Sequence, residues 1–568
     1  MILASRVDLA VTVVYMLLMI AVGVVLSLFN RDEADFFRSG NKMPWWLSGF
    51  SVFMSSFSVW TFTGAAGLAY RAPGAAFAMY LTTSIGMVFA VWPLAGLWRR
   101  SRSETILSYL TERYGLSTNQ TYSYTLLLAT LVQAGIQLLA LGKFISVAFG
   151  TDLVMTIIVC GVVISIYCLT GGLWAVAVTD TLQFMVLFPV ALVVAGVGLY
   201  RAGGIGAVVS KLPEGVWQVK TLEFDWWYVL AFGVMMVFAM NSGSMAQRYY
   251  SVKNEHEARK VAVLAMVLLA VAPFLWFLPP ILARVQGLDL KSITLGLAAP
   301  EEASYVGFCL YILPHGAIGV LLAGMMAATM SSLSATFNAY AGVITGDVVK
   351  QVFWKAASGR ALLFIGRIAT LVFGALVIAA AIAQSNSAGG VFGLMMTFSG
   401  VMIMPSGIPI VCGLFWKSTP PWAAIASYAV GVAVGVLFLA LDVDLSFTQQ
   451  VFIIGGISAA VYFIPGLLLE SDNEYSARVA RFFAKIATPV APGEVGDTSV
   501  TDPGSLRITG WTTVLMGAGA ASLALLDLPA GQRLINFAVG AAIALFGVVL
   551  MAVPRFLSAR KTGNVTQE

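Results

Sequence analysis

The sequence predicts an all-α protein that crosses a lipid bilayer many times. Of its 568 residues, 59% are hydrophobic and 10% are charged, whereas about a quarter of the residues in a soluble globular protein are charged. Apolar runs recur along nearly the whole chain, and most reach the roughly 20 residues that a helix needs to cross the hydrocarbon core. This pattern excludes a soluble enzyme and is typical of a polytopic membrane protein.

The apolar runs predict about fifteen membrane-spanning helices. The first run is too long for the apolar part of a usual signal peptide, so we expect a retained helix there. The run at 305–346 is too long for one span and should contain a reversal or a long tilted helix. The expected spans are 9–29, 45–70, 75–98, 122–147, 152–172, 177–200, 226–246, 261–284, 305–346, 363–384, 389–416, 421–441, 448–468, 510–528 and 534–554.

The distribution of lysine and arginine predicts how the chain is oriented. With the N-terminus outside and the C-terminus in the cytoplasm, most of the 32 lysines and arginines fall in cytoplasmic loops, as the positive-inside rule requires. The loops at 99–121 and 248–260 are then cytoplasmic, and the loop at 201–225 is external. The net charge of +5 is thus a topology signal. We expect a bacterial-type inner membrane protein with no nucleic-acid partner.

The longest polar connection, at 469–509, contains apolar residues at helical spacing. These are Tyr475, Val479, Phe482, Phe483 and Ile486, with basic residues on an adjoining face. The pattern is typical of a helix that lies on the cytoplasmic surface of the membrane. A solvated linker is the alternative.

Two spans contain hydroxyl and glycine residues that favour a break in the helix at mid-membrane. In the second span they lie between Ser51 and Gly64, and in the seventh span Gly243 lies between two serines. A broken helix is tolerated in the bilayer where it lines a cavity or is buried in protein. The two spans are five helices apart, as expected for inverted repeats whose broken helices meet at the substrate and ion sites. Ordinary close packing of small residues is the alternative.

The ninth span places several oxygen atoms on one face. Ala328, Ser331 and Ser332 lie at i, i+3 and i+4, so one carbonyl and two hydroxyls can point at the same spot. Hard cations such as sodium bind oxygen ligands, and carbonyls released by a broken partner helix could complete the shell. Serine hydroxyls that bond the carbonyl four residues back in their own helix are the alternative.

Asp180 is a carboxylate in the apolar sixth span. An ionisable residue within the membrane is by default a functional candidate, and a helix N-cap is the competing role. The spans contain no HExxH or GxSxG motif, so an intramembrane enzyme is not expected.

Several motifs, in order along the chain, resemble those of the sodium/solute symporter family. They are the Pro44-Trp45-Trp46 start of the second span, the stretch from Gly171 to Gln183, the Gln247-Arg248 pair, and the stretch from Ala328 to Asn338. The family includes sodium-coupled sugar, proline, sialic acid and monocarboxylate carriers. The resemblance, which covers about residues 5–465, implies a LeuT-type fold and a secondary carrier that imports a small organic solute with sodium by alternating access.

The resemblance also implies how the chain is divided. A five-plus-five inverted repeat would be preceded by one additional helix and followed by further helices. The expected divisions are 1–44 for the additional helix and a cytoplasmic loop, 45–200 and 201–416 for the two repeats, 417–468 for two further helices, 469–509 for a cytoplasmic linker, and 510–568 for two C-terminal helices and a tail.

Motif matching with the family implies a sodium site shared by the second and ninth spans. Its ligands would be the backbone carbonyls of Met54 and Phe57 together with oxygens of Ala328, Ser331 and Ser332. Some relatives bind a second sodium through an aspartate and further serines. Asp180 and Ser334 match two of those positions, whereas Ala335 occupies the position of another hydroxyl.

The resemblance places the solute in a pocket between the second, third and seventh spans. No arginine or lysine occupies the matched positions, so there is no obvious clamp for an acidic solute. Sugar carriers have an amide and a carboxylate where Thr61 and Tyr80 stand here, which weakens the case for galactose-type recognition. A sugar, an amino acid or a carboxylate remains open as the solute. The matched positions are Trp60, Thr61, Tyr80, Thr83, Met235, Phe238 and Ser242.

Two other functions are compatible with the resemblance. A proton-coupled carrier of the same fold would use Asp180 as its proton site. A membrane sensor would need a signalling domain after the helices, and the region after 468 contains a short linker and two expected spans. Solute uptake by the purified protein would exclude the sensor.

Overall fold

The computed structural model describes residues 3–27, 43–103, 105–169, 173–221, 223–242, 244–293, 299–354, 356–387, 389–469, 472–491, 494 and 503–563. All regular elements within these ranges are helical, which confirms the predicted fold class. The expected cytoplasmic loop before residue 43 lies outside the described residues, as do Gly171, Gly172 and Gly243. The elements of the first half are α1 (Arg6–Ser27), α3 (Trp45–Ser55), η2 (Val59–Phe62), α4 (Gly64–Arg71), α5 (Pro73–Phe89), η3 (Ala90–Leu94), α6 (Ala95–Ser101), α7 (Ile106–Arg113), α8 (Leu116–Phe149), α9 (Leu153–Cys168), α10 (Leu173–Ala202), α11 (Ile205–Lys211), α12 (Trp226–Ala239) and α13 (Ser244–Tyr250).

The second half continues the bundle and adds peripheral helices. Its elements are α14 (Glu255–Trp276), α15 (Leu278–Val285), η4 (Pro300–Ala303), α16 (Ser304–Ile312), α17 (Ala317–Gly342), η5 (Val343–Phe353), α18 (Gly359–Gln384), α19 (Gly390–Cys412), α20 (Pro421–Ala440), α21 (Phe447–Leu468), α22 (Asn473–Ala487), α23 (Pro503–Ser522), η7 (Leu523–Leu525) and α24 (Ala530–Gly563).

Ten helices of the described part are long and apolar enough to cross a membrane, or eleven if the bent α3–α4 pair forms one span. The apolar helices α9 and α12 are shorter than the others. The total of about fifteen spans therefore stays a prediction. The division of 45–200 and 201–416 into two inverted repeats likewise stays a prediction.

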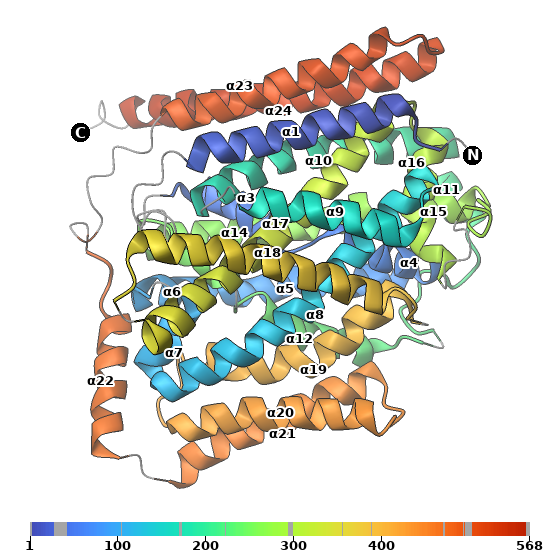
Figure 1. Cartoon of the computed structure of the whole chain (residues 1–568). Helices are drawn as coiled ribbons and strands as arrows, with labels where there is room; N and C mark the ends of the chain where they lie inside the picture. The colour runs from blue at the N-terminus through green and yellow to red at the C-terminus, as the bar shows by residue number, and fades with distance from the viewer. Residues whose placement is uncertain are drawn as a thin grey trace.

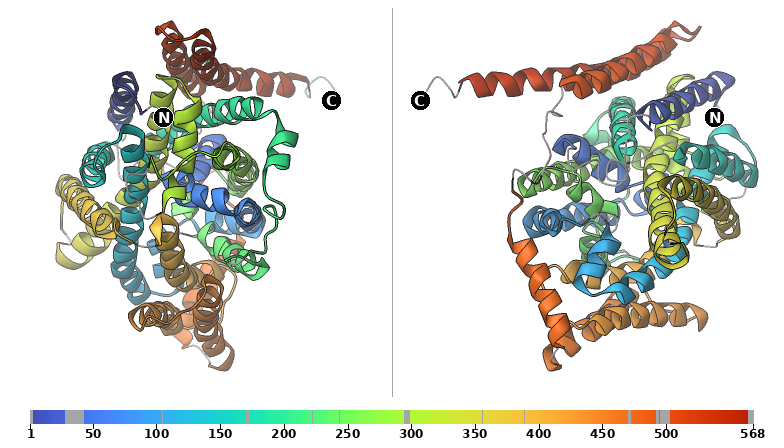
Figure 2. Two further views of the ribbon diagram at one scale, coloured as in Figure 1. Left: turned by 90° about the vertical axis from the view of Figure 1, so that its right-hand side faces the viewer. Right: turned by 60° about the vertical axis from the view of Figure 1, so that its left-hand side comes forward.

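The spanning helices run side by side, with one helical hairpin on each of two opposite flanks (Figure 1). The α23–α24 hairpin packs on α10, and the α20–α21 hairpin packs on α19. Helix α1 begins and α24 ends at opposite ends of the bundle (Figures 1 and 2). Helices α6 and α7 lie at one end of the bundle and α11 at the other, and which of these ends is cytoplasmic stays a prediction.

Two long runs of the sequence resolve into distinct elements. The run at 305–346 contains the short helix α16, a break before Gly316 at a positive φ of 92°, and the long helix α17. The connection at 469–509 contains α22, which runs crosswise over one end of the bundle (Figure 1). Its apolar residues Tyr475, Val479, Phe482 and Ile486 are buried against the protein. The expected helix exists, but it lays its apolar face on the bundle and not on lipid.

The C-terminal hairpin is held together by close backbone contact. A Cβ atom added at Gly517 would collide with Ala544, and one at Gly540 would collide with Ala521. Small residues at such crossings let membrane helices approach closely, where dispersion and packing supply the attraction.

Candidate substrate and sodium site

The first break separates α3 from the segment formed by η2 and α4, and the axes of the two parts are bent by 53°. Ser56 Oγ donates to Val52 O at 2.6 Å, and the Val59 N–H donates to Thr329 Oγ1 of α17 at 3.2 Å. Side chains thus satisfy backbone groups that the break exposes, which is the condition for interrupting a helix at this depth. The second span is therefore interrupted within its hydroxyl-rich stretch, as the sequence predicts.

The second break separates α12 from α13. Asn241 Nδ2 donates to Val237 O at 2.7 Å, and Ser242 Oγ donates to Phe238 O at 2.8 Å. These bonds cap carbonyls of the last turn of α12, where the regular backbone hydrogen bonding of the helix ends. The seventh span is therefore interrupted, as predicted.

A cavity of about 950 Å³ lies beside both breaks. It extends along α7 and α17 as far as Lys350, whose side chain is exposed. The charged residues among its described lining are Glu112, Arg248 and Lys350, which come from α7, α13 and η5. Arg248 lies next to the first break, where its Nη2 donates to Ser55 Oγ at 3.0 Å, and the other lining residues of α3 and η2 are aromatic or uncharged polar.

The structure brings five of the seven predicted solute residues to this cavity. They are Trp60, Thr61, Tyr80, Thr83 and Ser242.

Met235 and Phe238 are not among the lining residues. On α12 the cavity is lined instead by Phe232, Met236 and Ala239, which lie at i, i+4 and i+7 and so share one helix face. Phe238 packs against Gly407 of α19. The matched positions are thus displaced around the helix by one residue, or about 100°, from the face that lines the cavity.

Aromatic rings and one hydroxyl shape the predicted solute position. The Trp60 and Tyr80 rings are nearly parallel, with an interplanar angle of 17° and centroids 6.5 Å apart. The Tyr80 side chain is 8% exposed, and its hydroxyl makes no hydrogen bond with the described residues. Thr61 is near enough to influence that hydroxyl without meeting hydrogen-bond geometry. A buried hydroxyl without a partner is costly, so a solute hydroxyl or carbonyl would be stabilised here.

The predicted sodium ligands lie where the first break meets α17. Met54 lies in the last turn of α3 and Phe57 lies in the break, and both are buried. Ala328, Ser331 and Ser332 are buried on the facing helix α17, which the Val59–Thr329 bond joins to the break. The sequence and the structure therefore agree on which elements meet.

The two serines of α17 differ in their contacts. Ser332 Oγ donates to Gln137 Oε1 of α8 at 2.9 Å, and Ser331 Oγ has no hydrogen-bond partner in the described part of the chain. Neither bonds the carbonyl four residues back, so the alternative role for these two hydroxyls does not apply. Ser334 Oγ donates within α17 to Ser331 O at 3.0 Å. For Ser332 to reach an ion, its hydroxyl must leave Gln137.

Asp180 lies well inside α10, which begins at Leu173, and is not an N-cap. Its side chain is fully buried, and Ser51 Oγ of α3 donates to Oδ2 at 2.6 Å. Arg248 Nη2 of α13 lies 4.0 Å from the same oxygen. The Ser331 hydroxyl lies beside the carboxylate outside hydrogen-bond geometry, and Oδ1 has no described partner. Four helices thus meet at one carboxylate.

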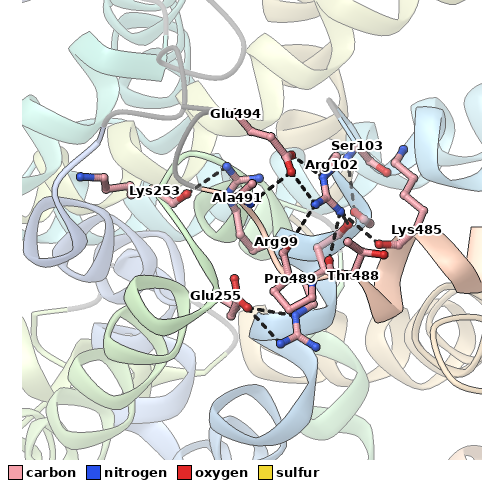
Figure 3. A network of polar contacts seen from close by, with 12 residues as sticks. Arg99, Arg102, Ser103, Lys253, Glu255, Lys485, Thr488, Pro489, Ala491 and Glu494 are labelled. Atoms are coloured by element: carbon pink, nitrogen blue, oxygen red, sulfur yellow. Dashed lines mark hydrogen bonds and ion pairs between the residues drawn. The ribbon is translucent and has the colours of Figure 1, made fainter. Parts of the chain in front are cut away.

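The end of the cavity near α7 is bordered by contacts with α22 and the segment after it. Lys485 of α22 pairs with Glu112 of α7 at 2.7 Å. Arg102 donates through both Nε and Nη2 to Glu494, at 2.6 and 2.9 Å, and also to Thr488 O (Figure 3). These bonds tie the loop between α6 and α7 to α22.

Three residues of this region were not predicted from the sequence. Gln137 is an uncharged residue of a long apolar helix, and its partner Ser332 is distant in sequence. Arg248 was noticed as part of a motif without a role. Lys143 of α8 pairs with the buried Glu302 of η4. It is a lone lysine in an apolar span, and an intramembrane charge is a signal by itself that could have identified it.

A helical membrane bundle with two broken spans beside a cavity is typical of a secondary transporter. The family model described as "SSF: Sodium:solute symporter family" matches residues 36–431. The chain belongs to the sodium:solute symporter family. It is therefore a membrane transporter and not an enzyme, and the family supports sodium-coupled solute transport.

Individual relatives agree with this assignment. The chain is 25% identical to sodium/glucose cotransporter 1 of Ovis aries over 473 residues, which are 76% of this chain and 71% of the relative. It is 25% identical to sodium/myo-inositol cotransporter 2 of Sus scrofa, covering 77% of this chain and 70% of the relative. A solved Na⁺-coupled sialic acid symporter has the same fold, with a TM-score of 0.69 and 22% identity over 82% of this chain and 98% of that one.

Proposed function

We propose that this chain imports a small uncharged organic solute together with sodium by alternating access. The observation that carries the proposal is the cavity beside the two broken helices, which reaches the α7 end of the bundle and has aromatic residues at its other end. By the positive-inside rule, the α7 end is cytoplasmic. In this proposal the structure is the state open to the cytoplasm, with the N-terminus outside.

The proposed sodium ligands are Met54 O, Phe57 O, Ala328 O and the hydroxyls of Ser331 and Ser332. The interface between the first break and α17 supports them. The Ser332–Gln137 bond supports a site that is released in this state, because one ligand is engaged elsewhere. Sodium binding from outside would draw α3 and α17 together, and downhill sodium entry would drive uptake, at about 2.3 kcal/mol per 100 mV for each charge.

Among the predicted solutes, a sugar or another neutral ring compound fits the lining better than a carboxylate. The predicted solute residues that line the cavity are aromatic or uncharged polar, and the charged residues of the described lining come from α7, α13 and η5. An isolated carboxylate is expensive to bury without a charged partner. An aromatic face packs well against a planar or ring-shaped solute, with polar groups fixing its orientation.

Uptake into proteoliposomes tests this proposal. Purified protein should accumulate a neutral sugar or polyol from a panel when a sodium gradient is imposed, and should not do so with an equal potassium gradient. The panel includes amino acids and carboxylates of similar size. Accumulation of a carboxylate alone would contradict the proposed solute class, and uptake that ignores sodium would contradict the coupling.

Single serine substitutions test the sodium site. Ser332→Ala removes one ligand and leaves the others, and losing a hydrogen-bond-scale contact to a charge costs about 1.5–3 kcal/mol. The sodium concentration for half-maximal uptake should therefore rise on the order of tenfold. Ser165→Ala is the matched control, because Ser165 Oγ bonds Gly161 O of its own helix. Unchanged sodium binding in both Ser331→Ala and Ser332→Ala would rule out these ligands.

Asp180 distinguishes sodium coupling from proton coupling. Its unpartnered oxygen beside Ser331 supports an ion at this carboxylate, either a second sodium with Ser334 or a proton. Asp180→Asn should alter the sodium dependence of uptake more than solute selectivity. If the parent instead accumulates solute in response to a pH jump without sodium, and Asp180→Asn abolishes that response, the carrier is proton-coupled.

A further inference from the structure

A buried ion pair lies towards the end of α8 that is remote from α7. We call this the closed side, because the described cavity lining on α8 ends at Gln137. Lys143 Nζ of α8 and Glu302 Oε2 of η4 are 3.0 Å apart, and each side chain is 5% exposed. Removing two charges from water costs several kcal/mol per ion, so a buried pair is weak grounds for stability by itself. Its presence calls for another explanation, which the second oxygen of Glu302 provides.

The other carboxylate oxygen holds the start of α19. Glu302 Oε1 accepts from the N–H groups of Val391 and Phe392, at 2.6 and 3.0 Å. Gly390 precedes them with a φ of +63°, and a Cβ atom there would lie 2.6 Å from the same oxygen. The positive end of a helix dipole and its free N–H groups stabilise a carboxylate. One side chain thus joins α8, η4 and α19.

The start of α19 in turn covers the cavity. Trp60 Nε1 donates to Val391 O at 3.1 Å. The Trp60 and Phe392 rings stack with centroids 6.0 Å apart and an interplanar angle of 11°. Trp60 lines the cavity, and so does Met395, which lies one turn farther along α19. The two residues whose N–H groups bind Glu302 are therefore the same two that contact Trp60.

Helix capping alone does not account for this arrangement. A cap needs one acceptor, which a neutral side chain supplies, whereas Lys143 adds a buried charge from a different helix. The charge has a consequence if α19 moves, because Glu302 must then either follow α19 and leave Lys143 unpaired or stay and release the helix. Both outcomes are costly in a low-dielectric interior, so the pair favours two discrete positions.

We infer that Lys143 and Glu302 are positioning residues of the gate on this side, and that their ion pair holds the start of α19 against Trp60 while the cavity is open at the α7 end. The inference rests on the proposed alternating access. Opening towards the other side requires this three-element contact to separate. The ion pair therefore sets the fraction of molecules in which the gate is open and the substrate site can be reached from the side that we propose to be external.

Cysteine accessibility tests the inference. Met395→Cys places a reporter thiol in the cavity behind the gate, and the four native cysteines are buried. A membrane-impermeant thiol reagent is applied to right-side-out vesicles. The variant Lys143→Met/Glu302→Gln removes both charges and retains an acceptor for α19, so neither charge is left unpaired. Glu257→Gln, which breaks the more exposed Lys260–Glu257 pair, is the matched control.

The neutral double variant should be labelled faster than the parent, on the order of tenfold, because a population shift towards the open gate exposes the reporter. Its sodium concentration for half-maximal uptake should fall, since sodium is bound from that side. Lys143→Gln/Glu302→Gln provides a second neutral pair if the methionine variant does not reach the membrane. Glu257→Gln should behave as the parent does.

Two results would overturn different statements. If a folded neutral double variant transports solute and its reporter cysteine is labelled at the parent's rate, the ion pair has only a structural role and the inference is wrong. If the parent shows no sodium-dependent uptake but the neutral double variant is labelled faster than the parent, the proposed function is wrong, whereas the role of the ion pair in holding the gate closed is supported.

Discussion

The two ends of the cavity are held by ion pairs of opposite character. On the closed side, the Lys143 and Glu302 side chains are each 5% exposed. On the open side, Arg102 and Glu494 are 21% and 39% exposed, and Lys485 and Glu112 are 31% and 39% exposed. Buried charges interact strongly and cannot be left single, whereas exposed pairs contribute about 0–1 kcal/mol each and are screened by salt. In the proposed carrier, the closed side would therefore favour two discrete states, whereas the open side would adjust gradually.

The largest expected effect on the free energy of unfolding comes from removing one charge of the buried pair. Glu302→Ala leaves Lys143 unpaired and the start of α19 without its acceptor, which should cost about 3–5 kcal/mol of stability. Thermal unfolding of the purified protein should show a large drop in midpoint temperature, whereas the neutral double variant should lose much less. Equal losses in the two variants would mean that the unpaired charge is not the cause.

Arg113 sharpens the comparison, because it lies at the open end and is nevertheless buried. Its guanidinium donates to Gly413 O, Trp416 O and Lys417 O at 3.2, 2.7 and 3.1 Å. Arg113→Ala leaves these carbonyls without a donor, and we expect a loss of about 3 kcal/mol or more, since each orphaned group costs about 1–3 kcal/mol. A stability unchanged from the parent in the same unfolding assay would show that water replaces the guanidinium.

A smaller effect is expected for the exposed pair that joins α22 to α7. Lys485→Ala should cost about 0.2–1 kcal/mol. The difference from the parent should vanish in about 0.5 M KCl, where the Debye length is a few ångströms. Potassium is used so that the sodium site is not affected. A salt-independent difference would indicate that the Lys485 side chain acts by packing.

The smallest effect concerns pH at Glu494. Hydrogen bonds from Arg102 and from the Ala491 N–H lower the pKa of Glu494 to about 2. A carboxylate with a lowered pKa contributes stability that is present above its ordinary pKa of about 4.5 and is lost as pH falls through the lowered value. The stability difference between the parent and Glu494→Gln should therefore be constant from pH 5 to 8 and shrink only below about 4.5. A difference that changes between pH 6 and 8 would contradict this assignment.

Local sequence patterns predicted the helices and their breaks well. The serines and threonines after Ser51 compete with the backbone for hydrogen bonds, and Ser56 does so at the observed break. Asp180 was predicted to be a functional acid because burying a carboxylate is expensive, and it is fully buried. The break was predictable because its physical cause lies within a few residues of the pattern, whereas the functional role of Asp180 stays a prediction.

The solute face of α12 could not be predicted in the same way. Its apolar residues occur all around the helix, so periodicity does not distinguish Met235 from Met236. Which of them lines the cavity depends on the rotation of α12 about its own axis, and packing of Phe238 against Gly407 accompanies the observed rotation. Motif matching identified the helix and missed its lining face by one residue.

The sequence alone determined that this chain is a bundle of apolar helices with two interruptions, because hydrophobic length and local hydrogen-bond competition act over short stretches of chain. The tertiary structure decided which distant groups meet. Lys143 and Glu302 are 159 positions apart in the chain, and Ser332 and Gln137 are 195 apart. No local pattern specifies such pairs, since each contact exists only once the packing of several helices has fixed both partners.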